Sequence, residues 1–139
     1  MERNLSIDLH VLTARLDRAA DRLLRAGHGI SYRRFLALSL VGEFGMTTQR
    51  ALAEALGVTE PSVSRMATTL AAEGFLEVGP DPAGGNRRQL GLTDTGRRLV
   101  ASAQTELEDR LAMLVSDSEV PYAEYSEYTA RLLAALDNP

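Results

Sequence analysis

The sequence of 139 residues contains no cysteine, no tryptophan and no lysine, and it has two histidines, His10 and His28. Without cysteine the chain has no disulfide, no thiol nucleophile and no thiolate redox switch. Two distant histidines are too few for a zinc site, and we expect neither a metal nor another cofactor. No apolar run approaches the roughly 18 residues of a membrane helix, and the first residues lack a signal-peptide pattern. We therefore expect a cytoplasmic protein without membrane contact.

The net charge of −4 is distributed unevenly along the chain. Residues 1–46 have a balance of +2, residues 47–98 a balance of 0 and residues 99–139 a balance of −6. Binding to nucleic acid depends on the local potential, so an acidic last third does not exclude a DNA-binding surface elsewhere.

The apolar pattern predicts a mainly helical protein. Leucines at heptad spacing predict a first helix over residues 5–26, with Gly27 as its left-handed cap. Ser31 is placed to cap a second helix. Thr93 is predicted to cap a long helix, and a last helix is predicted to start near Pro121. One chain of this size cannot cover all their apolar stripes, so we expect the terminal helices to form a two-fold dimer.

The segment TTQRALAEALGVTEPSVSRMATTLAAEGF, residues 47–75, has the spacing of a helix-turn-helix. Ala53 is the small residue where the two helices cross, and Gly57 is the turn residue that tolerates a positive φ. Thr59 is placed to cap the second helix, with Pro61 in its first turn.

The outward face of this second helix carries short hydroxyls and one arginine, and no carboxylate. Its members are Pro61, Ser62, Ser64, Arg65, Thr68 and Thr69. Hydroxyls and arginine can donate to phosphates and base edges, where a carboxylate would be repelled, so this face predicts contact with a DNA major groove. Thr59 is included in this predicted DNA contact.

The start of the preceding helix has two interpretations. Thr47, Thr48 and Gln49 offer side chains and helix N-terminal amides to phosphate, or they are ordinary capping residues.

The segments FLEV, GPDPAGGN and RRQLGL predict a β-hairpin over residues 75–92. Arg87 and Arg88 lie where its loop returns to the second strand. Arginines at such a tip can enter a minor groove, or they form a solvated turn.

Two segments, LAEALGVTEPSVSRMATTLAAEGFLEV and LGLTDTGRRL, resemble the multiple-antibiotic-resistance regulator (MarR) family of winged-helix transcription factors. The resemblance implies a homodimer that binds double-stranded DNA at a pseudo-palindromic operator, usually as a repressor, and is often released by a small ligand. It implies a winged helix-turn-helix region at residues 31–93, with the helix-turn-helix at 48–73 and the wing at 75–92. The dimerisation region is then residues 1–30 and 94–139.

One departure concerns the wing, where the family usually has Asp-x-Arg. The matching segment GGNRRQLGLT has no Asp two places before either arginine, so the wing contact is assigned to Arg87 or Arg88 without a choice between them.

The resemblance also implies an effector site between the dimer helices and the winged lobe. The candidates at that location are His10, Arg15, His28, Tyr32, Phe35 and Met113. The absence of cysteine excludes thiol-oxidation sensing.

The alternative to a regulator is a winged-helix module that binds another protein instead of DNA. Such a surface should carry aromatic or aliphatic anchors on the outward face of residues 59–70, and that face carries Ser, Thr and Arg. An enzyme is not expected, because no nucleophile lies in a recognisable turn and PAGGNRR lacks the spacing and the lysine of a P-loop.

Overall fold

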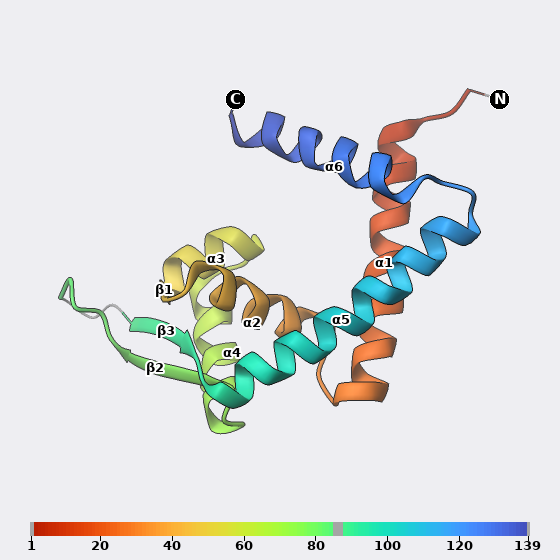
Figure 1. Ribbon diagram of the computed structural model, residues 1–139. Coiled ribbons are helices and arrows are strands. Elements are labelled where there is room, and N and C mark those ends of the chain that lie inside the picture. Colours follow the sequence, from red (N-terminus) through yellow and green to blue (C-terminus); the bar gives the residue numbers. More distant parts are fainter. Residues whose placement is uncertain (1, 85–87, 139) are drawn as a thin grey trace. The chain divides into compact units, whose positions relative to one another are not determined.

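The computed structural model describes residues 2–84 and 88–138, and the chain divides into two compact units, residues 1–103 and 104–139 (Figure 1). It is mainly helical with one small antiparallel sheet, as predicted. The elements are α1 Leu5–His28, α2 Tyr32–Phe44, β1 Thr47–Thr48, α3 Gln49–Leu56, α4 Glu60–Ala72, β2 Leu76–Pro80, β3 Arg88–Leu92, α5 Asp94–Asp117 and α6 Tyr122–Asp137.

A hydroxyl side chain caps the N-terminus of four of the helices. Ser31, Thr48, Thr59 and Thr93 each accept a hydrogen bond from the backbone N–H three residues later, at 3.2, 3.1, 3.3 and 3.0 Å. These bonds satisfy donors that have no partner inside the helix. The caps expected at Ser31, Thr59 and Thr93 are confirmed, and Thr48 rather than Thr47 caps α3.

The predicted end of the first helix was wrong by two residues. Helix α1 continues through Gly27 to His28, and the left-handed cap is Gly29, at φ 65°. The N–H of Ile30 reaches back to the carbonyl of Leu24 at 3.5 Å, and both side chains are buried. Burial of this apolar pair selects Gly29 as the turn residue, because such a contact accompanies this type of cap.

The sheet has the order β1-β3-β2 and contains a strand that the sequence pattern did not predict. In β1, Thr47 pairs with Leu90 and Thr48 with Gln89. Strand β2 pairs with β3 in the hairpin, from Leu76 opposite Leu92 to Pro80 opposite Arg88. The hairpin extends away from the helices of the first unit (Figure 1).

The core of the first unit lies between α1, α2, α3, α4 and β3. Its largest fully buried side chains are Leu24, Leu38, Val41, Leu52, Val63, Leu70 and Leu90. Burying a side chain of this kind stabilises a fold by about 1.5–3 kcal/mol, so these contacts set the positions of the helix-turn-helix.

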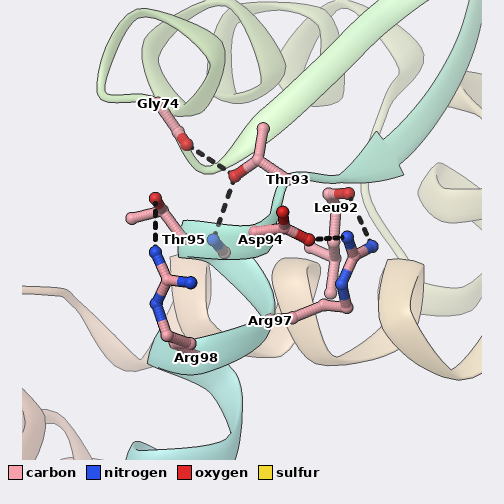
Figure 2. Close-up of polar contacts among 8 residues, drawn as sticks. Gly74, Leu92, Thr93, Asp94, Thr95, Arg97 and Arg98 are labelled. Atoms are coloured by element: carbon pink, nitrogen blue, oxygen red, sulfur yellow. Dashed lines mark hydrogen bonds and ion pairs between the residues drawn. The ribbon is translucent and has the colours of Figure 1, made fainter.

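A polar joint connects the end of α4 to the start of α5 (Figure 2). The Thr93 hydroxyl donates to the Gly74 carbonyl at 2.6 Å, and the Thr93 N–H donates to the Phe75 carbonyl at 3.1 Å. Arg97 donates to the Leu92 carbonyl at 3.0 Å and also binds the Asp94 carboxylate. The base of the hairpin is therefore fixed to the first turn of α5.

A second polar joint connects α1 to α2. The Asp21 carboxylate accepts from the Tyr32 backbone N–H at 2.9 Å and from the Arg25 guanidinium at 2.8 Å. The Tyr32 amide, followed by Arg25, holds the pKa of Asp21 below its ordinary value of 3.8. Both bonds favour the charged carboxylate.

A substitution of Gly96 tests the polar joint at the base of the hairpin. A Cβ atom at this position would lie much closer to the backbone carbonyl of Phe75 than van der Waals contact allows. Gly96→Ala is expected to cost about 1–3 kcal/mol of unfolding free energy, measured by urea denaturation. Gly79→Ala is the control, since a Cβ there has no atom within 4 Å. Equal stability of the two variants would contradict the close contact.

The lowered pKa of Asp21 predicts that the free energy of unfolding depends on pH. Because its folded pKa lies below 3.8, its contribution is present above that pH and is lost as the pH falls through the folded pKa. Asp21→Asn should be less stable than wild type at pH 7, and the difference should shrink below pH 3.8. Urea unfolding at pH 7 and pH 3 measures this, with Asp17→Asn on the same helix as the control. A difference that is the same at both pH values would refute the assignment.

Candidate nucleic-acid interface

An open groove on the first unit is formed by the N-terminus of α3, the N-terminus of α4 and the start of β3. Its lining residues are Thr48, Gln49, Arg50, Glu60, Pro61, Ser64 and Arg88. These come from the helix-turn-helix and from the wing, so the groove brings together residues up to 40 positions apart in the sequence. Thr48, Gln49, Pro61, Ser64 and Arg88 were predicted to contact DNA.

Two helix N-termini open into this groove, at Gln49 and at Glu60. The first-turn N–H groups and the helix dipole make each end partly positive, which favours an anion such as phosphate. The capping hydroxyls of Thr48 and Thr59 accept from backbone N–H groups and keep their own hydrogen free to donate. Capping and phosphate contact are thus compatible for these two threonines.

The arginines of this surface differ in their partners. Arg65 on α4 and Arg88 on β3 are exposed, and neither has an ion-pair partner within the described part of the chain. Arg50 lies 3.7 Å from Glu54, with both side chains more than 70% exposed, so this pair holds it weakly. Arg87, the other predicted wing contact, lies outside the described residues.

The hydroxyls of α4 are not equivalent. The Thr68 hydroxyl donates to the Ser64 carbonyl at 2.9 Å, so it offers only its lone pairs to another molecule. Ser62 and Ser64 are half-buried, and neither hydroxyl has a partner among the residues that the structure describes. Ser64, inside the groove, can therefore both donate and accept.

Thr47 differs from the rest of the predicted set. The residue is only 8% exposed, and its backbone pairs with Leu90 of the central strand β3. Thr47 is the least accessible of the predicted contacts that the structure describes.

Sequence reasoning missed Arg50 and Glu60, and the interpretation of the helix face as free of carboxylates was wrong for its first turn. Helix α4 begins at Glu60, which lies in the groove with Ser64. The signal was present: Thr59 as the cap makes Glu60 the first helical residue, and a residue four positions before Ser64 lies on the same helix face.

The geometry agrees with comparisons to known proteins. Residues 28–85, from the end of α1 to the wing loop, match the sequence model of the MarR family. An HTH-type transcriptional regulator of Mycobacterium tuberculosis is 31% identical over 117 residues, which cover 81% of each chain.

The chain belongs to the MarR family. It is a transcriptional regulator with the DNA-binding winged helix of that family. The fold agrees with solved members over nearly the whole length. A Staphylococcus aureus MepR–DNA complex matches with a TM-score of 0.75 at 22% identity, covering 98% of each chain. NadR in complex with 4-hydroxyphenylacetate matches with a TM-score of 0.80 at 20% identity, covering 99% of this chain and 94% of NadR.

In this MarR-family protein, Asp81 forms a turn at the start of the wing loop. The Asp81 carboxylate accepts from the Ala83 N–H at 3.0 Å, and the Asp81 carbonyl accepts from the Gly84 N–H at 3.0 Å. This turn follows directly after β2, and it orders the loop as far as Gly84.

The candidate effector residues lie on three helices. His10, Arg15 and His28 belong to α1, and Tyr32 and Phe35 belong to α2. The rings of Tyr32 and Phe35 stack with centroids 6.3 Å apart, and Phe35 is only 2% exposed. Met113 lies on the part of α5 that belongs to the second unit and is exposed.

Metal-binding clusters and membrane-spanning helices are absent from the described residues. No group of three or more His, Asp or Glu side chains is placed to hold a metal ion. No helix is both long and apolar enough to cross a membrane.

Proposed function

We propose that this regulator is a homodimeric repressor that binds a pseudo-palindromic operator and is released by a small ligand. The observation that carries the proposal is the groove in which two helix N-termini meet Arg88 of the wing. Residues 31–93 would form the DNA-binding region, and residues 1–30 and 94–139 the dimerisation region. The two recognition helices, α4 of each subunit, would lie about one DNA turn apart, ~34 Å.

In this proposal α4 enters the major groove. Ser64 and Arg65 face base edges or phosphates, Thr68 accepts one turn further along, and Arg88 or Arg87 reaches the minor groove. Thr48 and Gln49 contact the flanking backbone through the α3 N-terminus. The lining residues include no aromatic side chain, which favours DNA over a protein partner at this surface.

The exposed apolar residues support dimerisation through both terminal segments. Leu5, Leu9 and Leu12 on α1 are 68%, 44% and 40% exposed. Helix α6 exposes Tyr122, Tyr125, Tyr128, Leu132, Leu133 and Leu136. Surfaces of this extent on a soluble chain mark an interface, and a second copy is the simplest partner.

Control by a small ligand is supported by the resemblance to the MarR family and by two of the similar solved structures. MepR is solved with DNA, and NadR is solved with 4-hydroxyphenylacetate. A small effector that binds a non-DNA-binding arrangement of the dimer better would shift the population away from the operator. His10, Arg15, His28, Tyr32, Phe35 and Met113 are the proposed contacts.

DNA binding is tested by fluorescence anisotropy on DNA from upstream of the protein's own gene, against scrambled DNA, over ~50–200 mM salt. Arg65→Ala and Arg88→Ala are each expected to weaken binding by about 1–3 kcal/mol if they read bases. A loss that is uniform over all sequences, with a salt slope reduced by about 1, identifies a phosphate contact. Arg3→Ala is the charge-matched control, and an equal loss in that variant would contradict the placement of the groove.

Dimerisation is tested by Leu12→Glu, which places a charge in the apolar stripe of α1. Burial of an unpaired carboxylate is costly, so sedimentation velocity should show a shift from dimer to monomer at micromolar concentration. Arg18→Glu, at a position about 120° around the same helix from Leu12, should remain dimeric. A dimeric Leu12→Glu variant would show that the interface lies elsewhere.

A further inference from the structure

We infer that Glu60 is a specificity-determining residue that selects cytosine at one position of each operator half-site. The inference rests on the proposed binding of DNA in the groove. The negative charge of Glu60 opposes the binding of DNA phosphates, so the presence of this residue in the groove requires an explanation.

The position of Glu60 is defined by three observations. It is the first residue of α4, directly after the Thr59 cap. It lines the groove with Ser64 and with Arg88 from the wing. Its carboxylate is exposed and has no hydrogen-bond or ion-pair partner in the parts of the chain that the structure describes, although two arginines line the same groove.

An unpaired carboxylate on a phosphate-binding surface weakens binding to every DNA sequence alike. The positive end of the α4 dipole offsets part of this repulsion, because Glu60 lies in the first helical turn. The rest of the cost is offset when the carboxylate accepts a hydrogen bond from a base. Residues at the N-terminus of a recognition helix are the ones that contact base edges.

The chemistry of the carboxylate limits the base that it can read. An ionised Glu only accepts hydrogen bonds, whereas guanine N7 and O6 and thymine O4 are also acceptors and repel it. Cytosine N4 and adenine N6 carry donors. Adenine also presents the N7 acceptor beside its donor, so cytosine is the better partner. The Ser64 hydroxyl lies one helical turn further along α4 and is free to donate a hydrogen bond. Ser64, rather than Glu60, can therefore bind the acceptor atoms of guanine.

The test is a selection of bound duplexes from a randomised library by wild type, Glu60→Ala, Glu60→Gln and the control Glu2→Gln, which removes the same charge at the exposed N-terminus. Anisotropy on the selected duplex and its single-base variants then gives the discrimination at each position. Thermal unfolding confirms that each variant is folded.

Wild type should prefer cytosine at one base pair of each half-site by about tenfold. Glu60→Ala should lose this preference at that base pair alone and bind non-specific duplex more tightly than wild type. Glu60→Gln should move the preference toward adenine, which a neutral amide contacts through both a donor and an acceptor. Glu2→Gln should match wild type.

Two results overturn the inference in different ways. An unchanged preference at every position in Glu60→Ala would mean that Glu60 serves only as an acidic residue of the first helical turn, and the proposed regulator function would stand. Failure of the folded wild-type dimer to bind any duplex in the library would overturn the proposed function, and the inference with it.

Discussion

The pairing of two residues in β1 with β3 is the constraint on which the groove depends. Thr48 lies opposite Gln89, so the preceding residue of β3, Arg88, is held beside the N-terminus of α3. The Thr48 hydroxyl also caps α3 at the Ala51 N–H. Thr48 therefore joins the wing strand to the helix-turn-helix, and because of this pairing Arg88 of the wing shares a surface with two helix N-termini.

The base of the hairpin is fixed independently. Thr93 binds the carbonyls of Gly74 and Phe75, while the close approach of Gly96 to Phe75 leaves no room for a side chain. The wing is thus held to α3 along β3 and to α5 at its base. A displacement of the first turns of α5 would carry the end of α4 and the wing together. In the proposed dimer, such a movement would change the separation of the two recognition helices rather than deform either groove.

Most of the fold could be predicted from the sequence because its signals are local. Hydroxyl caps at Ser31, Thr59 and Thr93, and the turn at Gly57, act within a few residues of themselves. The features that were missed depend on contacts between distant residues. Burial of Ile30 against Leu24 moves the cap from Gly27 to Gly29. A strand of two residues has no periodicity, so β1 follows only from its pairing with β3.

The candidate site was predictable to a similar extent and for the same reason. The hydroxyls and the arginine of α4 were identified from helical spacing, and these assignments stay predictions. The back-bonding of Thr68 to Ser64, which restricts its hydroxyl to accepting, is invisible in the sequence. The predicted face begins at Pro61 and omits Glu60, the first residue of α4, although a first-turn residue lies where base edges are read.

The electrostatics of the groove make dimerisation a condition of tight binding in the proposed function. Each DNA-binding surface has few cations without a partner: among the described residues these are Arg88 in the groove and Arg65 on α4, and Glu60 opposes them. Phosphate contacts supply most of the sequence-independent affinity, so one lobe alone binds weakly. Joining two lobes makes the second contact intramolecular and multiplies the affinity without any new residue. The net negative charge does not exclude this, because binding to phosphate depends on the local potential at the DNA-binding surface. A protein with a net charge of −4 can therefore bind DNA, and in the proposed dimer a change of dimer geometry would change the affinity.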